Sequence, residues 1–348
     1  MSAPSYRKND ITILRTLSML MIVLCHIIRY YTFIPGSQFL GQILDVGVFV
    51  FLLISGYLYG FRERKPFGKF ILTRALRIGM PTLIVLIIDA AVLFFFFDEK
   101  YDFSTLICYL FNLQGLAFVC WDLFSCFFVQ IENLGPLWFA SIIMICYCML
   151  PLCYYIRGRL TQKKQWLILL GALAFCGALQ YVLNVNLFYF LTFYFGFLLA
   201  DSKKSLARIP NFKFAILCAI LTTIQFLRLL LLILIDGSQL YMTFVSYSHI
   251  SLGLLLFVVV VEMNKRIPKI FDAIANCWVV KKLDKISFHI YLVHGVFCFG
   301  VTNIYKAITN IILATFVYFI LVSLATILLY YLDKLILIPS QRLLRKIG

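Results

Sequence analysis

Residues 11–31 read ITILRTLSMLMIVLCHIIRYY, an apolar run that contains an arginine and a histidine. About 20 apolar residues are enough for a helix to cross the bilayer core. Arg15 and His26 are eleven positions apart, and eleven steps of about 100° bring both side chains to one helix face, roughly 16 Å apart along the axis. Ionisable side chains inside a spanning helix generally face the protein interior or a wet cavity. We therefore interpret this pair as the start of a functional site.

The rest of the chain has the composition of a membrane protein. Of its 348 residues, 63% are hydrophobic and 13% are charged, and the mean hydropathy is +0.97, which excludes a soluble globular protein of this size. The apolar runs are continuous rather than alternating, which favours helices over a barrel. We expect an all-α, polytopic integral membrane protein with about ten transmembrane helices. The expected spans are 11–31, 42–61, 79–97, 134–156, 166–184, 187–201, 213–235, 242–262, 286–305 and 310–333.

The basic residues predict how these helices are oriented, because Lys and Arg collect on cytoplasmic loops. With the N-terminus inside, the opposite side keeps essentially Lys100 and Lys306. We therefore expect both termini to be cytoplasmic. This topology accounts for the formal net charge of +16, so no nucleic-acid partner is expected, although basic loops also attract anionic lipid or a phosphorylated cofactor. The expected cytoplasmic clusters lie at residues 7–8, 62–77, 157–164, 203–213, 265–285 and 334–346.

One long segment, residues 98–133, falls on the expected outer side and is rich in acidic and aromatic residues. Its ends are too polar for a span, so we expect a re-entrant or surface-lying helix that caps a central cavity. The first apolar run lacks a small-residue cleavage pattern and is interpreted as a signal anchor. The sequence contains neither an internal repeat nor a Gly/Ser linker, which predicts a single transmembrane domain over residues 1–348.

Most of the eleven cysteines lie in apolar runs, where free cysteine behaves as a small hydrophobic residue. Cys108, Cys120 and Cys126 lie in the outer segment and are candidates for one disulfide if that compartment is oxidising. The sequence contains neither a CxxC nor an HExxH motif, so no metal site is expected.

Several motifs follow one another along the chain. They are Asp10 ahead of the R-x10-H pair Arg15 and His26, GVFVFLLISGY at 47–57, KFILTRALRIGMP at 69–81 with its R-x-x-R, PLWF at 136–139 followed by Tyr147 and Pro151, and IYLVH at 290–294. In this order the chain resembles the acyltransferase-3 family of membrane acyltransferases. That family includes bacterial O-acetyltransferases of surface polysaccharides and lipid-linked sugars. One departure is Phe49, where many members carry an aspartate, so the acceptor of those members does not carry over.

The resemblance implies acetyl-CoA as the acyl donor and a hydroxyl of a cell-surface polysaccharide or lipid-linked sugar as the acceptor. It also implies a bacterial plasma membrane protein, with membrane lipid around it and a carbohydrate as its partner. Acyl transfer from a thioester to a hydroxyl needs a base, and His26 is our candidate because histidine titrates near neutral pH. Whether His26 is transiently acetylated or assists a direct transfer stays open.

The arginines suit the remaining parts of such a reaction. The guanidinium of Arg15 fits a carbonyl oxygen or a phosphate. Arg74 and Arg77 share a helix face and are candidates for binding the phosphates of coenzyme A. Weaker candidates for the substrate cavity are Ser55, Trp138, Tyr147 and His294.

These residues also have structural interpretations. Arg15 alone would be read as a snorkelling interface residue, and Arg74 and Arg77 as positive-inside anchors. Ser55 with Gly56 favours close helix packing over a nucleophile. Trp138 and Tyr147 are more often packing or interface aromatics.

Two other functions compete with acyl transfer. A transporter or flippase for a lipid-linked sugar or small anion would use the same buried charges, but repeats or paired broken helices are typical of that class. A glycan polymerase would also have many helices, yet we expect basic rather than acidic outer loops for it. A requirement for acetyl-CoA separates the acyltransferase from both.

Overall fold

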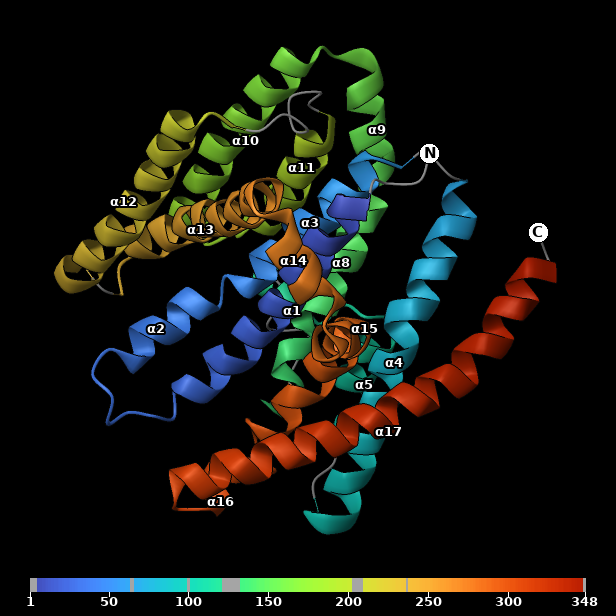
Figure 1. Ribbon diagram of the computed structural model, residues 1–348. Helices are drawn as coiled ribbons and strands as arrows, with labels where there is room; N and C mark the ends of the chain where they lie inside the picture. Colours follow the sequence, from blue (N-terminus) through green and yellow to red (C-terminus); the bar gives the residue numbers. More distant parts are fainter. Residues whose placement is uncertain are drawn as a thin grey trace. The chain divides into compact units, whose positions relative to one another are not determined.

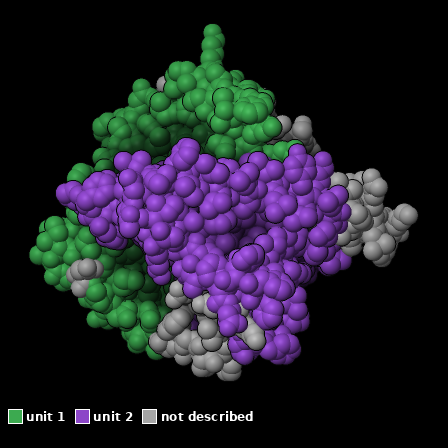
Figure 2. Space-filling view, turned by 90° about the horizontal axis from the view of Figure 1, so that it is seen from below, with its two compact units in different colours: residues 1–22, 42–64, 150–285 green, residues 23–41, 65–149, 286–348 purple. Residues whose placement is uncertain are grey.

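Figure 1 shows a computed structural model of the protein, which describes residues 5–62, 66–98, 101–120, 132–201, 209–235 and 237–346. Every regular element in these residues is a helix, which confirms the all-α class. The chain divides into two compact units, coloured separately in Figure 2. Unit 1 comprises Met1–Ile22, Gln42–Arg64 and Leu150–Lys285, and unit 2 comprises Val23–Gly41, Lys65–Met149 and Ile286–Gly348. The expectation of a single domain stays a prediction.

Eight helices within the described ranges are long and apolar enough to cross a bilayer, as expected for a multi-pass membrane protein. Each corresponds to one of the expected spans. They cover Asn9–Ile28, Ser37–Gly60, Phe67–Phe96, Asn133–Arg159, Gln162–Leu183, Asn211–Ile235, Gln239–Arg266 and Ile311–Ile336.

The other two expected spans take a different form. The sixth is α11 (Phe188–Asp201), which has only 14 residues. The ninth is interrupted, because α15 (Trp278–Val293) ends where the 3₁₀ helix η3 (His294–Phe297) begins. Gly300 lies just beyond with φ +62°, a conformation that favours glycine and ends helical progression. The count of ten and the orientation of the termini therefore stay predictions.

Unit 1 is built around the contact of α3 with α11. A Cβ added at Gly56 would overlap the carbonyl of Phe193, and one added at Gly196 would overlap the carbonyl of Leu53, so the two glycines let the backbones touch. α12 and α13 run beside each other in the same unit (Figure 1). The helices of unit 1 are the first part of α1 (Ser5–Ile28), α3 (Gly47–Gly60), α9 (Leu150–Arg159), α10 (Gln162–Leu183), α11, α12 (Asn211–Ile235), α13 (Gln239–Arg266), α14 (Pro268–Asn276) and the first half of α15; α2 (Ser37–Leu44) is divided between the units.

Unit 2 is built around α4 (Phe67–Phe96), which packs against α8 (Trp138–Cys148) and crosses α17 (Ile311–Lys346) (Figure 1). Two 3₁₀ helices, η1 (Glu132–Leu137) and η3, pack on each other next to α4. Their approach depends on Gly295, because a Cβ there would lie 2.7 Å from the Pro136 ring. The α-helix therefore gives way to η3 at the point where Gly295 lets the chain approach Pro136.

The outer segment was expected to form one re-entrant or surface-lying helix. Its described part, residues 101–120, instead contains two short helices, α5 (Phe103–Leu110) and α6 (Leu116–Val119). Cys108 and Cys120 are not joined to each other by a disulfide. Cys126, the third candidate, lies outside the described residues. The remaining short element is α16 (Ile304–Ala307).

Candidate active site

Two histidines lie face to face in unit 2. His26 belongs to the last turn of α1, and His294 opens η3 directly after α15. Their ring centroids are 5.3 Å apart with an interplanar angle of 26°, a stacked arrangement. The ring of Phe299 meets His26 edge-on at 5.0 Å. The sequence predicted His26 and His294 as separate site residues, and the structure brings them together.

Hydrogen bonds fix both the orientation and the tautomer of His294, which is fully buried. Its Nδ1 lies 2.6 Å from the carbonyl oxygen of Tyr291. A carbonyl only accepts, so Nδ1 carries the proton, and Nε2 of the neutral ring keeps its lone pair. The Tyr318 hydroxyl donates to the backbone carbonyl of His294 at 3.3 Å, and the Tyr291 hydroxyl donates to that of Pro136. These bonds hold the imidazole rigidly beside His26.

Each of the two rings has a buried nitrogen that no described protein group satisfies. These atoms are Nδ1 of His26 and Nε2 of His294. Buried polar atoms are rarely left unpaired, because each costs about 1–3 kcal/mol, and such atoms in a native structure point to a strained or functional site. An imidazole nitrogen with a free lone pair is a proton acceptor, so this pair can perform general base chemistry.

Arg15 is held in unit 1 by an aspartate that the sequence analysis missed. Its Nη2 donates to Oδ2 of Asp284 at 2.9 Å, and its Nε lies 2.9 Å from Oδ1, so the two side chains form a close ion pair with one hydrogen bond. Thr12 donates to the same Oδ2 at 3.3 Å. Partial burial raises the pKa of the Asp284 carboxyl, and the facing guanidinium opposes that rise. Asp284 lies in the basic stretch KKLDK, and nothing in that stretch indicates that its carboxylate pairs with Arg15.

Arg15 and His26 lie on one helix, as their spacing requires. α1 runs without interruption from Ser5 to Ile28, so both residues belong to one helix. The division between the units falls within α1, and Arg15 belongs to the part in unit 1 while His26 belongs to the part in unit 2.

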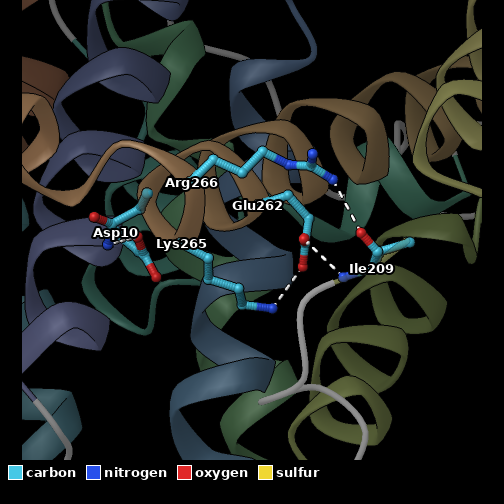
Figure 3. A network of polar contacts seen from close by, with 6 residues as sticks. Asp10, Ile209, Glu262, Lys265 and Arg266 are labelled. Atoms are coloured by element: carbon cyan, nitrogen blue, oxygen red, sulfur yellow. Dashed lines mark hydrogen bonds and ion pairs between the residues drawn. The ribbon is translucent and has the colours of Figure 1, made fainter. Parts of the chain in front are cut away.

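Polar contacts join the beginning of α1 to the end of α13 in unit 1 (Figure 3). Asn264 donates to Asp10, which is buried. The buried Glu262 accepts from Lys265 and from the backbone NH of Ile209 at 3.0 Å. Arg266 donates to the Ile209 carbonyl at 3.0 Å (Figure 3). Asp10 is thus placed in a structural network.

Arg74 lies between two aromatic rings of unit 2. Its guanidinium carbon is 5.6 Å from the ring centroid of Phe70 and 5.6 Å from that of Tyr147, within the range of cation–π attraction. The structure therefore joins two predicted site residues, Arg74 and Tyr147. Arg77 lies three residues on in the same helix and is exposed.

Ser55 and Trp138 lie in other surroundings. Ser55 is on α3 in unit 1, next to the glycine that contacts α11. Trp138 begins α8 in unit 2 and stacks on Phe118 with centroids 4.8 Å apart. Neither contributes to the histidine pair or to the Arg15 contact, and their assignment to a substrate cavity stays a prediction.

A cavity of about 130 Å³ in unit 2 lies beside the histidine segment and is mostly apolar. Val293 and Val296, which flank His294 in sequence, line it together with Asp89 of α4. Asp89 is buried and accepts hydrogen bonds from Tyr101 and, at 3.4 Å, from Asn133. The sequence analysis overlooked Asp89 within the apolar run of α4. None of the four predicted cavity residues lines this cavity.

Arg228 of α12 is a charge inside an apolar run that hints at a wet cavity, and the structure shows it fully buried. Its Nη2 lies 3.3 Å from the side-chain oxygen and 3.4 Å from the carbonyl of Gln42, near the end of α2. Nε2 of His249 lies 3.0 Å from the same carbonyl. A cation at the last turn of a helix satisfies its carbonyls and its dipole, so Arg228 caps α2.

Within the described residues, no group of three or more His, Cys, Asp or Glu side chains is arranged to hold a metal ion. The protein is thus a helical multi-pass membrane protein with a stacked imidazole pair. Comparison with protein families matches residues 8–332, nearly the whole chain, to the acyltransferase-3 family, described as an acyltransferase domain. The chain belongs to this family and is a membrane acyltransferase. Neither the curated proteins nor the solved structures compared with the chain gave a significant match.

Proposed function

We propose that the protein transfers an acetyl group from acetyl-CoA to a hydroxyl of a cell-surface polysaccharide or lipid-linked sugar, in the plasma membrane of a bacterium. The observation that carries the proposal is the stacked pair of His26 and His294, each with a buried ring nitrogen lacking a protein partner. A family of acyltransferases needs a base at the reacting hydroxyl, and each of these two nitrogens is a proton acceptor in a buried setting.

In this proposal His26 takes the proton of the acceptor hydroxyl as its oxygen attacks the thioester carbonyl. The carbon–oxygen bond forms, the carbon–sulfur bond breaks, and the proton passes to the leaving thiolate, so that an ester and the free thiol of coenzyme A result. His294 holds the His26 ring in place by stacking, and its own orientation is fixed through Tyr291. The positively charged Arg15, roughly 16 Å along the helix from His26, suits a phosphate of the donor.

Arg74 and Arg77 are proposed to bind the phosphates of coenzyme A. The two aromatic rings around Arg74 hold its guanidinium in a defined orientation, which lowers the entropy lost on binding an anion. Arg77 is exposed on the same helix and adds a second positive charge. The pair therefore suits a ligand with several phosphate groups.

The test is transfer of labelled acetyl from acetyl-CoA to a panel of membrane glycan fractions, in membranes with and without the protein. Covalent label on a glycan together with stoichiometric release of coenzyme A supports the proposal. A transporter or flippase would instead move an intact solute across sealed vesicles without consuming acetyl-CoA. Transport without acetyl transfer across the whole panel contradicts the proposed function.

A further inference from the structure

The segment that joins α14 to α15 in unit 1 exposes large apolar side chains. α14 buries only Ala275 in full. Ile270 is 54% exposed, Ile274 is 43% exposed, and Trp278, the first residue of α15, is 69% exposed. Side chains of this size are left uncovered when they face a partner or lipid.

Two lysines lie on the same side of α15 as this tryptophan. Lys281 and Lys282 follow Trp278 by three and four residues, so the three side chains share one helix face, and both lysines are exposed. The Lys282 Nζ lies 4.9 Å from the centre of the Trp278 ring. We call Ile270, Ile274, Trp278, Lys281 and Lys282 the α14–α15 surface.

The carboxylates of this segment are engaged elsewhere. Asp272 of α14 accepts a hydrogen bond from Asn9 near the beginning of α1, and Asp284 of α15 pairs with Arg15. These two carboxylates are outnumbered by Lys269, Lys281, Lys282 and Lys285, so the surface keeps a positive character. The Asn9 contact also places α14 at the end of unit 1 where α1 begins.

We propose that the α14–α15 surface binds an anionic phospholipid of the leaflet in which α1 begins. The isoleucines and the tryptophan would contact the acyl boundary, while Lys281 and Lys282 would bind the phosphate. A short helix with one apolar side and flanking Lys and Trp is the composition that lies in the interface plane of an anionic membrane. A nucleotide phosphate would meet the lysines but would leave both isoleucines exposed, so lipid is the occupant that fits the whole surface.

This site would act on the same helix that carries Asp284. Lys281 and Lys282 lie within one turn of Asp284, whose carboxylate holds Arg15. A bound headgroup would fix this turn of α15 and, through Asp284, the position of Arg15. Lipid binding itself does not depend on the proposed acyltransferase function and can be measured without it.

The test measures how much phosphatidylglycerol the full-length protein retains in nanodiscs. The nanodiscs contain phosphatidylcholine with roughly 20% phosphatidylglycerol, an anionic content on the order of that in cell membranes. The variant Lys281→Gln/Lys282→Gln is compared with Lys163→Gln/Lys164→Gln. The control pair has the same net charge change and also lies near a tryptophan, Trp166, but that ring packs edge-on against Phe195 at 5.3 Å. The two variants therefore differ in the surface and not in charge.

Each lysine near an anionic surface contributes an attraction of about five-fold in affinity, so the first variant should lower phosphatidylglycerol retention on the order of ten-fold or more, and the control should not. Trp278→Ala should also weaken retention, and Trp166→Ala should not. Equal loss in both lysine variants would show a general charge effect and overturn the proposal. Displacement of the lipid by millimolar-range coenzyme A would assign the surface to a nucleotide and overturn it as well.

Discussion

Replacing His294 by alanine tests whether the second histidine serves catalysis or only packing. The substitution removes the hydrogen bond to the Tyr291 carbonyl, worth about 1 kcal/mol, and the stacking on His26, worth about 0.5–1.5 kcal/mol. It also leaves a small cavity at a fully buried site. Together these losses should destabilise the protein by roughly 2–4 kcal/mol. Acetyl transfer should fall about a hundredfold, because His26 loses the ring that orients it.

His289→Ala is the matched control, since it removes another buried histidine, from α15, the helix that directly precedes η3. Nε2 of His289 lies 3.1 Å from Oδ2 of the buried Asp333, so its loss should cost a similar amount of stability. His289 has no place in the proposed reaction, and transfer per folded molecule should stay close to wild type. The assay is labelled acetyl transfer normalised to folded protein, with thermal unfolding in detergent.

Two outcomes refute this reasoning. Wild-type transfer by His294→Ala would show that His26 acts without its neighbour. An equal loss in His294→Ala and His289→Ala would show that the effect comes from stability alone. Added imidazole should partly restore transfer to His294→Ala, because the vacated site has the shape of that ring, and the control should not respond.

Other changes probe the arginines and the helix packing. Asp284→Asn should leave Arg15 less well held and lower kcat/KM about tenfold. The free energy of unfolding should change by less than about 1 kcal/mol, because the arginine is 40% exposed, and kinetics and unfolding are measured on the same samples. Arg74→Lys should raise the KM for acetyl-CoA about tenfold with little change in kcat, since lysine lacks the planar fork; an unchanged KM would remove Arg74 from the donor site. Gly56→Leu should lower the unfolding temperature, consistent with a cost of about 1–3 kcal/mol or more where α3 touches α11; an unchanged temperature would contradict that packing.

The spans could be predicted from the sequence because hydropathy acts locally. Eight expected spans correspond to helices long enough to cross a bilayer. The change from α15 to η3 within the ninth expected span was not predicted, because residues 286–305 are mostly apolar, while η3 lies where Gly295 closely approaches Pro136, a residue far away in sequence. Hydropathy reports burial and not the close approach of two backbones.

The candidate site was only partly predictable, for a similar reason. His26 was found by its place inside an apolar helix, and Arg15 by its spacing from His26. Their partners His294 and Asp284 come from the far end of the chain, and the pairing of a side chain across a fold leaves no periodic pattern. Asp284 was further hidden because a carboxylate among lysines is typical of a solvated surface.

Most directly, the central claim is tested by acetyl transfer from labelled acetyl-CoA by wild type and His26→Ala at equal membrane abundance and equal folded fraction. A base in the reaction typically contributes about 10²–10⁴-fold, so the variant should lose at least about a hundredfold in rate while still binding acetyl-CoA. Equal transfer by the two proteins would contradict the assignment of His26 as the base.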